Sequence, residues 1–359
     1  MKKLIRILFL VLISSTCAFS CTNNVVTPTP PYQEEKGKQV PTVDPGGDPD
    51  KPHASVRPSD TDKNWIKRTI VDGIVYWEFR AYDSISGAYQ FVHVADIDMS
   101  KGYKFIIGYD GNSHTTSEMF KKKNALVAIN AGYETSSIFV KYSGQLVFNI
   151  QNDCISGTSV TNWKNDGAVC IEDFAGTKVS ICNAMCSNEG EDGVSQYGKA
   201  LAAQREYYRN GSFIKKQAGV ISSAPLLIYD YHPYGTTFVP TISSSAINSY
   251  AYEHPFHHQG VRHPRSAVGI DGDGHILLIV ADGRYTSICD GFTAKELTNF
   301  LIKYFDPKYA LNMDGGGSST MCVSGLGDES TNVVNYPCDD GKATHSGERT
   351  VRTFFCITR

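Results

Sequence analysis

Residues 312–321 read Asn-Met-Asp-Gly-Gly-Gly-Ser-Ser-Thr-Met and directly follow an apolar run that predicts a buried strand. Three consecutive glycines allow the backbone to turn sharply and to approach a ligand closely. Backbone N–H groups and hydroxyls in such a turn can hold an anion. Asp314 ends the strand, so we expect it to act on whatever the turn holds. The segment lacks the Gly-Lys-Ser/Thr element of a nucleotide-binding P-loop, and the alternative interpretation is a plain glycine-rich turn capped by Asp314.

The order of elements around this segment occurs twice in the chain. A strand ending in Asp-Gly, a capped helix, an apolar strand and a glycine turn follow one another in residues 103–132 and again in residues 275–316. We interpret this as an internal pseudo-repeat in which Asn130 and Asp314 end matching strands. Their loops are then expected to open into the same cleft. The alternative is a coincidence of two common units.

Local signals predict a strand-rich fold. Asp72-Gly73 between two apolar runs predicts a type I′ hairpin. Residues 271–274, Asp-Gly-Asp-Gly, open like a calcium loop, but the later ligand positions are apolar, so a second hairpin is predicted. Capping boxes starting at Thr115 and Thr293 each predict a helix. The expected fold class is α+β: a single strand-rich domain with mainly antiparallel sheet and a few helices.

A second chemical signal precedes the second hairpin. Arg262 and Arg265 bracket His263 and lead into a strand, and the return strand ends in Asp282-Gly283-Arg284. The planar guanidinium group matches a pair of phosphate oxygens and stays charged near neutral pH. These residues therefore indicate an anion site, unless the arginines are ordinary solvated surface residues.

A third signal ends the first copy of the repeat. Residues 130–134 read Asn-Ala-Gly-Tyr-Glu after an apolar run. The amide of Asn130 can donate and accept hydrogen bonds to a sugar, and Glu134 offers a second carboxylate. A simple turn after a buried strand explains the same residues equally well.

In order and spacing, Arg262 to Thr320 resembles the core of the phosphodiester glycosidase domain family. The matching residues are Arg-Ser-Ala-Val-Gly at 265–269, Asp-Gly at 282–283 and Asn-Met-Asp-Gly-Gly-Gly-Ser at 312–318. The resemblance covers about Thr69 to Thr358 and is loose between Cys154 and Val261.

The resemblance continues on both sides of this core. Upstream, Asn130 to Tyr133 is similar to the family's Asn-Gly-Gly-Phe, with Ala131 in place of a glycine. Downstream, Val333 to Val351 resembles the closing segment, including Gly347-Glu348-Arg349. Glu134 departs from the family pattern, where an aromatic residue is usual, and an insertion near residues 342–346 departs as well.

The resemblance implies hydrolysis of a sugar-1-phosphodiester at the glycosidic C–O bond, which releases the free sugar and a phosphomonoester. A phosphate leaves readily, so positive charge and a carboxylate matter more than a strong general acid. No cofactor is expected to be required, and a divalent metal is left open. The catalytic candidates are Asp314, Asp282 and Glu134. The substrate-binding candidates are Arg265, Arg262, His263, Arg284, Asn130, Gly132, Gly315, Gly316, Gly317, Ser318, Ser319, Glu348 and Arg349.

Two other function classes stay open on the sequence. A metal-dependent phosphodiesterase would cut the P–O bond, and a non-catalytic lipoprotein would bind glycans on an aromatic face. Histidines at 254, 257, 258 and 263 hint at the first. The second would use tyrosines 207, 208, 231, 234 and 252.

The N-terminus predicts export. A basic start and a short apolar run resemble a signal peptide over residues 1–20, and Ala-Phe-Ser before Cys21 resembles a relaxed lipidation signal. Residues 21–63 hold eight of the 15 prolines and predict a lipid-anchored tether. The glycosidase-like domain is then expected over 64–359, in the bacterial cell envelope, on the periplasmic or outer surface. The net charge of −3 gives no indication of nucleic-acid binding.

Eight cysteines follow Cys21 in the chain. In an exported protein such cysteines are expected to form disulfides. Eight cysteines allow 105 pairings, so the sequence assigns none.

Overall fold

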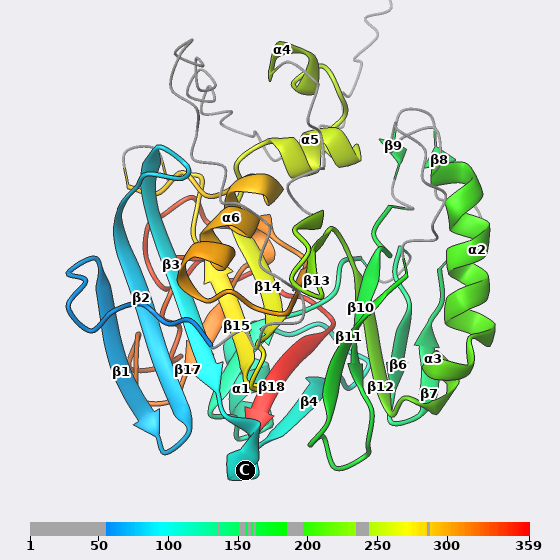
Figure 1. Ribbon diagram of the computed structural model, residues 1–359, viewed down its shortest axis with the longest axis horizontal. Coiled ribbons are helices and arrows are strands. Elements are labelled where there is room, and N and C mark those ends of the chain that lie inside the picture. The colour runs from blue at the N-terminus through cyan, green and yellow to red at the C-terminus, as the bar shows by residue number, and fades with distance from the viewer. Residues whose placement is uncertain are drawn as a thin grey trace, which may run out of the picture. The chain divides into compact units, whose positions relative to one another are not determined.

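Antiparallel strands dominate the computed structural model of the protein, and they are arranged in three main sheets (Figure 1). Every strand pairing recorded in the described part of the chain is antiparallel, which confirms the predicted α+β class with mainly antiparallel sheet. The structure describes residues 55–134, 137–150, 155–156, 159–160, 163–184, 197–234, 244–285 and 288–359.

The largest sheet has seven strands. They lie in the order β1 (Trp65–Val71), β2 (Ile74–Asp83), β3 (Ala88–Ile97), β15 (Ile276–Ala281), β14 (Arg265–Ile270), β16 (Tyr309–Asn312) and β13 (Leu226–Tyr229).

Two further sheets pack against it. The five-stranded sheet has the order β11 (Val179–Asn183), β10 (Gly167–Ile171), β12 (Gly219–Ser223), β6 (Val140–Tyr142) and β7 (Gln145–Phe148). The four-stranded sheet has the order β17 (Met321–Val323), β5 (Val127–Asn130), β18 (Phe354–Thr358) and β4 (Lys104–Gly108). A separate pair joins β8 (Ile155–Ser156) to β9 (Ser159–Val160).

One large apolar core is shared by all three main sheets, with Ile97, Ile107 and Ile221 among its members. Each sheet has a second apolar cluster on its other face, where helices cover it. Figure 1 shows α6 lying across β14 and β15, and α2 beside the five-stranded sheet. The helices are α1 (Thr116–Lys122), α2 (Tyr197–Asn210), α3 (Ser212–Lys216), α4 (Ser244–Ile247), α5 (Pro255–Gly260) and α6 (Ala294–Tyr304).

The structure contains the turns and capped helices that the local sequence signals predict. Gly73 has φ +82° in the turn between β1 and β2, a conformation that favours glycine. The Asp271–Gly274 turn joins β14 to β15, so the hairpin interpretation is confirmed. Both capping boxes are complete, at Thr115 for α1 and at Thr293 for α6.

The two copies of the predicted repeat share one topology. In the first copy β4 and β5 flank β18, and both pair with it antiparallel. In the second copy β15 and β16 flank β14 in the same way. Each copy is therefore a strand, a capped helix and a parallel strand, with a third strand inserted between the two. This supports the pseudo-repeat over coincidence.

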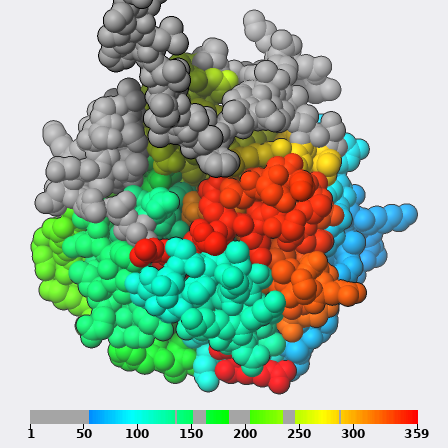
Figure 2. Space-filling view, turned by 180° about the vertical axis from the view of Figure 1, so that it is seen from behind, coloured from blue at the N-terminus to red at the C-terminus, as the bar shows by residue number. Residues whose placement is uncertain are grey.

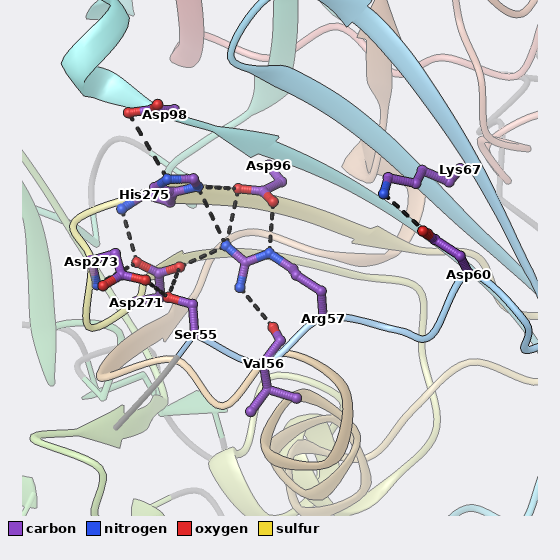
Figure 3. Close-up of polar contacts among 10 residues, drawn as sticks. All are labelled: Ser55, Val56, Arg57, Asp60, Lys67, Asp96, Asp98, Asp271, Asp273 and His275. Carbon is purple, nitrogen blue, oxygen red and sulfur yellow. Dashed lines mark hydrogen bonds and ion pairs between the residues drawn. The ribbon is translucent and has the colours of Figure 1, made fainter. Parts of the chain in front are cut away.

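Polar contacts attach the start of the described chain to the domain. Figure 3 shows the Arg57 guanidinium between two carboxylates: its Nε lies 2.6 Å from Asp96 Oδ2 and its Nη2 lies 2.6 Å from Asp271 Oδ2. Ser55 Oγ donates to Asp271 at 2.9 Å, and His275 Nδ1 lies 2.8 Å from Asp96 Oδ1. The sequence assigned residues 55–57 to the tether, whereas these contacts begin before residue 64.

This network is expected to stabilise the fold mainly at mildly acidic pH. The hydrogen bond to Asp96 raises the pKa of His275 above 6.5, so its contribution is complete below that value and is lost as pH rises through the folded pKa. Burial acts to raise the pKa of Asp96, but hydrogen bonds from His275 and Arg57 outweigh it and lower the pKa below 3.8. Its contribution is lost only as pH falls through that lowered value. Asp98, Asp271 and Asp273 also face the network.

We therefore expect His275→Ala to lower the melting temperature more at about pH 5.5 than at about pH 8.5, where the native imidazole has lost much of its charge. Thermal unfolding of both proteins at the two pH values measures this. An equal loss at both would show that His275 acts through packing rather than charge.

The predicted signal peptide, Cys21 and residues up to 54 lie outside the described part, so those predictions stay predictions. Within the described residues, no helix has the length and apolar character needed to cross a membrane. Six described cysteines carry free thiols, at positions 170, 182, 289, 322, 338 and 356, and the Sγ atoms of Cys170 and Cys182 lie 4.0 Å apart. Disulfide formation also stays a prediction, because Cys154 and Cys186 lie outside the described residues.

Candidate active site

The strand ends of the two repeats meet at one place. Asn130 Nδ2 donates to the main-chain carbonyl of Asp314 at 2.7 Å, and Asp314 N–H donates to the carbonyl of Ala131 at 2.9 Å. Asn130 Oδ1 accepts from Ser266 Oγ at 2.7 Å, which ties β14 to the same point. The loops carrying Asn130 and Asp314 therefore lie together, while the buried amide of Asn130 is used to join them.

The glycine loop makes room for two guanidinium groups. Gly316 has φ +63°, and a Cβ there would lie 3.0 Å from Nη2 of Arg284. A Cβ on Gly317 would lie 2.5 Å from Nη2 of Arg349. At Gly317 this distance is shorter than real Cβ contacts, so a side chain there would displace Arg349. At Gly316 the left-handed backbone conformation itself favours glycine.

Asp314 has an unusual electrostatic environment. Burial raises its pKa to about 6, although a hydrogen bond from Ser318 and the charges of Lys164 and Arg349 act to lower it. The residue as a whole is half-buried. A carboxylate with a pKa near 6 is ionised at neutral pH and can accept a proton during a reaction.

An aromatic wall adjoins this carboxylate. Lys164 is buried, with its Nζ 2.6 Å from Glu253 Oε2 and 4.7 Å from the ring centroid of Tyr133. Trp163 Nε1 donates to the carbonyl of Glu253 at 2.9 Å, and its ring lies 5.7 Å from that of Tyr133. These contacts hold Glu253, which precedes α5, against Trp163 and Lys164, which precede β10.

Histidines form another part of the wall. The ring of His258 lies 4.8 Å from Trp163 and 6.0 Å from His263. Burial lowers the pKa of both histidines well below 6.5 and nearby Arg265 adds to the effect, so both rings are neutral at pH 7. His263 Nε2 is buried without a hydrogen-bond partner, whereas its Nδ1 lies 3.4 Å from Arg284 Nη2.

Comparison with known proteins identifies the family. The family model described as phosphodiester glycosidase matches residues 123–358. The chain belongs to the phosphodiester glycosidase family. Two N-acetylglucosamine-1-phosphodiester alpha-N-acetylglucosaminidases, from Homo sapiens and Bos taurus, are each 36% identical over 75 residues, which is 21% of this chain. The match spans only 13% and 12% of those two proteins.

A solved structure has a similar fold. The catalytic domain of zebrafish N-acetylglucosamine-1-phosphodiester alpha-N-acetylglucosaminidase, auto-inhibited by its pro-peptide, aligns with a TM-score of 0.50. Its sequence identity is 16%, and the alignment covers 85% of this chain and 87% of the zebrafish chain. This likeness supports the phosphodiester glycosidase fold for the described domain.

In this phosphodiester glycosidase domain, two of the predicted phosphate-binding arginines make contacts within the protein. Arg262 Nη2 pairs with Glu296 Oε1 at 2.7 Å and its Nη1 lies 3.2 Å from Asp290 Oδ2. Arg265 is 1% exposed, and burial lowers its pKa to about 10. Its Nε and Nη2 donate to the main-chain carbonyls of Phe292, His258 and Val261 at 2.8, 2.7 and 3.0 Å.

Asp282 is similarly engaged. Its carboxylate accepts from Asn335 Nδ2 at 2.9 Å and from the N–H of Tyr336 at 3.0 Å, and lies 3.2 Å from His93 Nε2. It is 1% exposed. These contacts join the end of β15 to the closing segment, and any catalytic role for Asp282 stays a prediction.

The remaining predicted residues separate into two groups. Arg284, exposed and with φ +67°, and Arg349, which pairs with Asp339, lie beside the glycine loop. Ser318 reaches Asp314, while the buried Ser319 Oγ has no partner among the described residues. The others contact structural neighbours or solvent: Gly132 N–H donates to Thr353, Glu348 accepts from Ser117, and Glu134 is exposed.

The sequence reasoning missed Lys164, Trp163 and Tyr133 as wall residues. No local motif marks them, since they come together only through the contacts with α5. The proposed tyrosine face does not form as one group in the described residues: Tyr208 belongs to α2 and is buried in an apolar cluster, whereas Tyr252 lies beside Arg284. No group of three His, Cys, Asp or Glu side chains suited to a metal was found in the described residues.

Proposed function

We propose that this protein hydrolyses the glycosidic C–O bond of a sugar-1-phosphodiester and releases the free sugar and a phosphomonoester. The observation that carries the proposal is the ionisable Asp314 carboxylate close to the charges of Lys164 and Arg349. Arg284 lies with Arg349 against the adjoining glycine loop. The family assignment supports a phosphodiester glycosidase, and the names of the human and bovine relatives point to N-acetylglucosamine 1-phosphodiesters.

The proposed reaction needs one base and a site for a leaving anion. Water attacks the anomeric carbon while Asp314 accepts its proton, and the electrons of the broken C–O bond leave with the phosphate oxygen. Arg284 and Arg349 stabilise the additional negative charge on that phosphate, as positioned cations do at other phosphoryl sites. The neutral His258 and His263 agree with a leaving group that departs without protonation.

The position of bond cleavage tests the function. The purified protein is incubated with the methyl ester of N-acetyl-α-glucosamine 1-phosphate in water labelled with heavy oxygen. We expect the label in the sugar, because water attacks carbon. Label in the phosphate would establish P–O cleavage and favour a phosphodiesterase. Absence of any hydrolysis would contradict the enzyme assignment.

The pH dependence follows from the raised pKa of Asp314. A base must be deprotonated to act, so kcat/KM is expected to rise as pH increases through about 6 and then to level off. Measurement of kcat/KM between about pH 4.5 and about pH 8 in buffers of constant ionic strength checks this. A profile that falls over the same range would instead require a protonated catalytic group.

A further inference from the structure

The hairpin of β2 and β3 extends past its neighbour in the large sheet. β2 pairs with β3 from Ile74 through to Asp83, whereas β15 pairs with β3 only as far as Val92. The outer part of the hairpin carries Tyr82 opposite Tyr89. Both rings are 57% exposed, and their centroids lie 5.7 Å apart. Large exposed aromatic groups of this kind commonly mark binding surfaces.

These rings lie on the same face of the sheet as the site. Side chains alternate between faces along a strand. Tyr76 of β2 and Ala95 of β3 belong to the shared core, and Tyr82 and Tyr89 each lie an even number of residues from them. The opposite face of the same strands packs against α6. The tyrosine pair therefore points toward the side on which the three sheets meet.

The aromatic surface continues inward from the pair. Arg80 lies over the rings of Phe91 and Tyr336, with its guanidinium carbon 4.9 and 5.4 Å from the two centroids. Phe91 and Tyr336 lie 6.0 Å apart, and His345 lies 5.0 Å from Tyr336. We call this set the aromatic strip; its members are Tyr82, Tyr89, Phe91, Tyr336 and His345, with Arg80 among them.

The aromatic strip adjoins Arg284 of the candidate active site. The N–H of Asp290 donates to the carbonyl of Tyr89 at 3.2 Å, and the carbonyl of Asp290 accepts from the N–H of Arg284 at 3.4 Å. On the other side, Cys338, two residues after Tyr336, lies 3.7 Å from Arg284 Nη1 through its Sγ. Seen from behind, orange and red segments from the C-terminal part of the chain adjoin blue segments from its N-terminal part (Figure 2).

We propose that the aromatic strip binds a glycan chain joined through phosphodiester links, extending beyond the linkage that is cleaved. The inference rests on the proposed function, since it names the substrate class of that same site. Sugar rings present apolar C–H faces that pack on aromatic rings, and their hydroxyls stay in water. Arg80 lies over two rings of the strip and pairs with Glu78 through Nε at 2.7 Å, and its guanidinium group supplies further N–H donors for a phosphate of the next repeating unit.

Comparison of a short and a long substrate tests the strip. The short probe is the methyl ester of N-acetyl-α-glucosamine 1-phosphate, and the long probe is a hexamer of N-acetylglucosamine units joined by 1,6-phosphodiesters. For Tyr82→Ala/Tyr89→Ala we expect KM for the hexamer to rise about tenfold, the size of effect that loss of two aromatic contacts produces. kcat/KM for the methyl ester should be unchanged.

Two control variants separate binding from folding. Tyr82→Phe/Tyr89→Phe keeps the rings and should restore the hexamer KM. Phe174→Ala removes an aromatic side chain that is 81% exposed in the turn after β10 and should leave both substrates unaffected. Thermal unfolding confirms that the alanine variant is folded.

Failure of the aromatic strip as a binding surface and failure of the proposed hydrolysis give different results. An unchanged hexamer KM, or an equal loss on both probes, would overturn the strip. If wild-type protein hydrolyses neither probe, the proposed function fails. Calorimetric measurement of hexamer binding by wild-type protein and the alanine variant then tests whether the aromatic strip binds the glycan. Binding weakened about tenfold in the alanine variant would support it, and equal binding would overturn it.

Discussion

Asp314→Asn is expected to lower turnover by about a thousandfold or more while raising the thermal stability of the protein. Asparagine has nearly the same shape and can accept the hydrogen bond of Ser318, but it cannot take a proton, and general bases contribute on this scale. The pKa of about 6 in the fold, against 3.8 in an unfolded chain, means that ionised Asp314 lowers the free energy of unfolding by about 3 kcal/mol.

The loss of stability caused by the ionised Asp314 carboxylate depends on pH. Folding raises the pKa of Asp314, so the ionised carboxylate destabilises the fold. This destabilisation grows as pH rises from about 4 to about 6 and is complete above about pH 6. The melting temperature of Asp314→Asn should therefore exceed that of the native protein by several degrees at about pH 8 and by little at about pH 4. Differential scanning calorimetry and single-turnover kinetics measure the two effects.

A matched control is available in Asp328. Its pKa is lowered to about 2 by hydrogen bonds from Ser330 and Thr331, and it lies in an exposed turn. Asp328→Asn should leave turnover unchanged and should not raise stability. If Asp314→Asn retained near-normal turnover, Asp314 would be a turn residue and Asp282 would become the catalytic candidate.

The second large effect is expected at Arg265. The sequence predicts that Arg265 binds the phosphate of the substrate. The structure instead shows a buried guanidinium group donating to three main-chain carbonyls. Lysine presents one nitrogen and cannot match this fork, and each buried acceptor left unpaired costs about 1–3 kcal/mol. We expect Arg265→Lys to lower the melting temperature by about 10 °C.

Arg284→Lys provides the contrasting case. Arg284 is exposed beside the glycine loop, so lysine should leave the melting temperature nearly unchanged. It should raise KM for the phosphodiester about tenfold, because the bidentate guanidinium contact is lost while one charge remains. The pair is compared by thermal unfolding and steady-state kinetics. An Arg265→Lys protein with native stability and impaired turnover would support direct phosphate binding by Arg265.

These two arginines show how far sequence reasoning extends. The hairpins, the capping boxes of α1 and α6 and the two-copy order of elements were predictable because their causes lie within a few residues. The adjacency of the Asn130 and Asp314 loops followed from that order. What an arginine binds is different, because its partners are chosen by the tertiary fold.

The same reason explains the predicted site residues that make contacts within the protein, and the residues that were missed. Arg262 binds Glu296, which is 34 residues away, and Glu348 binds Ser117, which is 231 residues away. Lys164 has no motif around it, and its place near Asp314 depends on the contact with Glu253. Such pairings carry no periodicity, so residue type alone could not separate structural charges from those facing the substrate.

The position of β18 has a consequence for how the polypeptide reaches its native state. This strand, the last in the described chain, lies between β4 and β5 in the four-stranded sheet. β4 and β5 have no strand to pair with on their facing edges until residues 354–358 arrive. Pairings between such distant segments form slowly and leave strand edges unpaired meanwhile. In a chain emerging N-terminus first from a ribosome or a membrane pore, this sheet would thus stay incomplete until residues 354–358 were released.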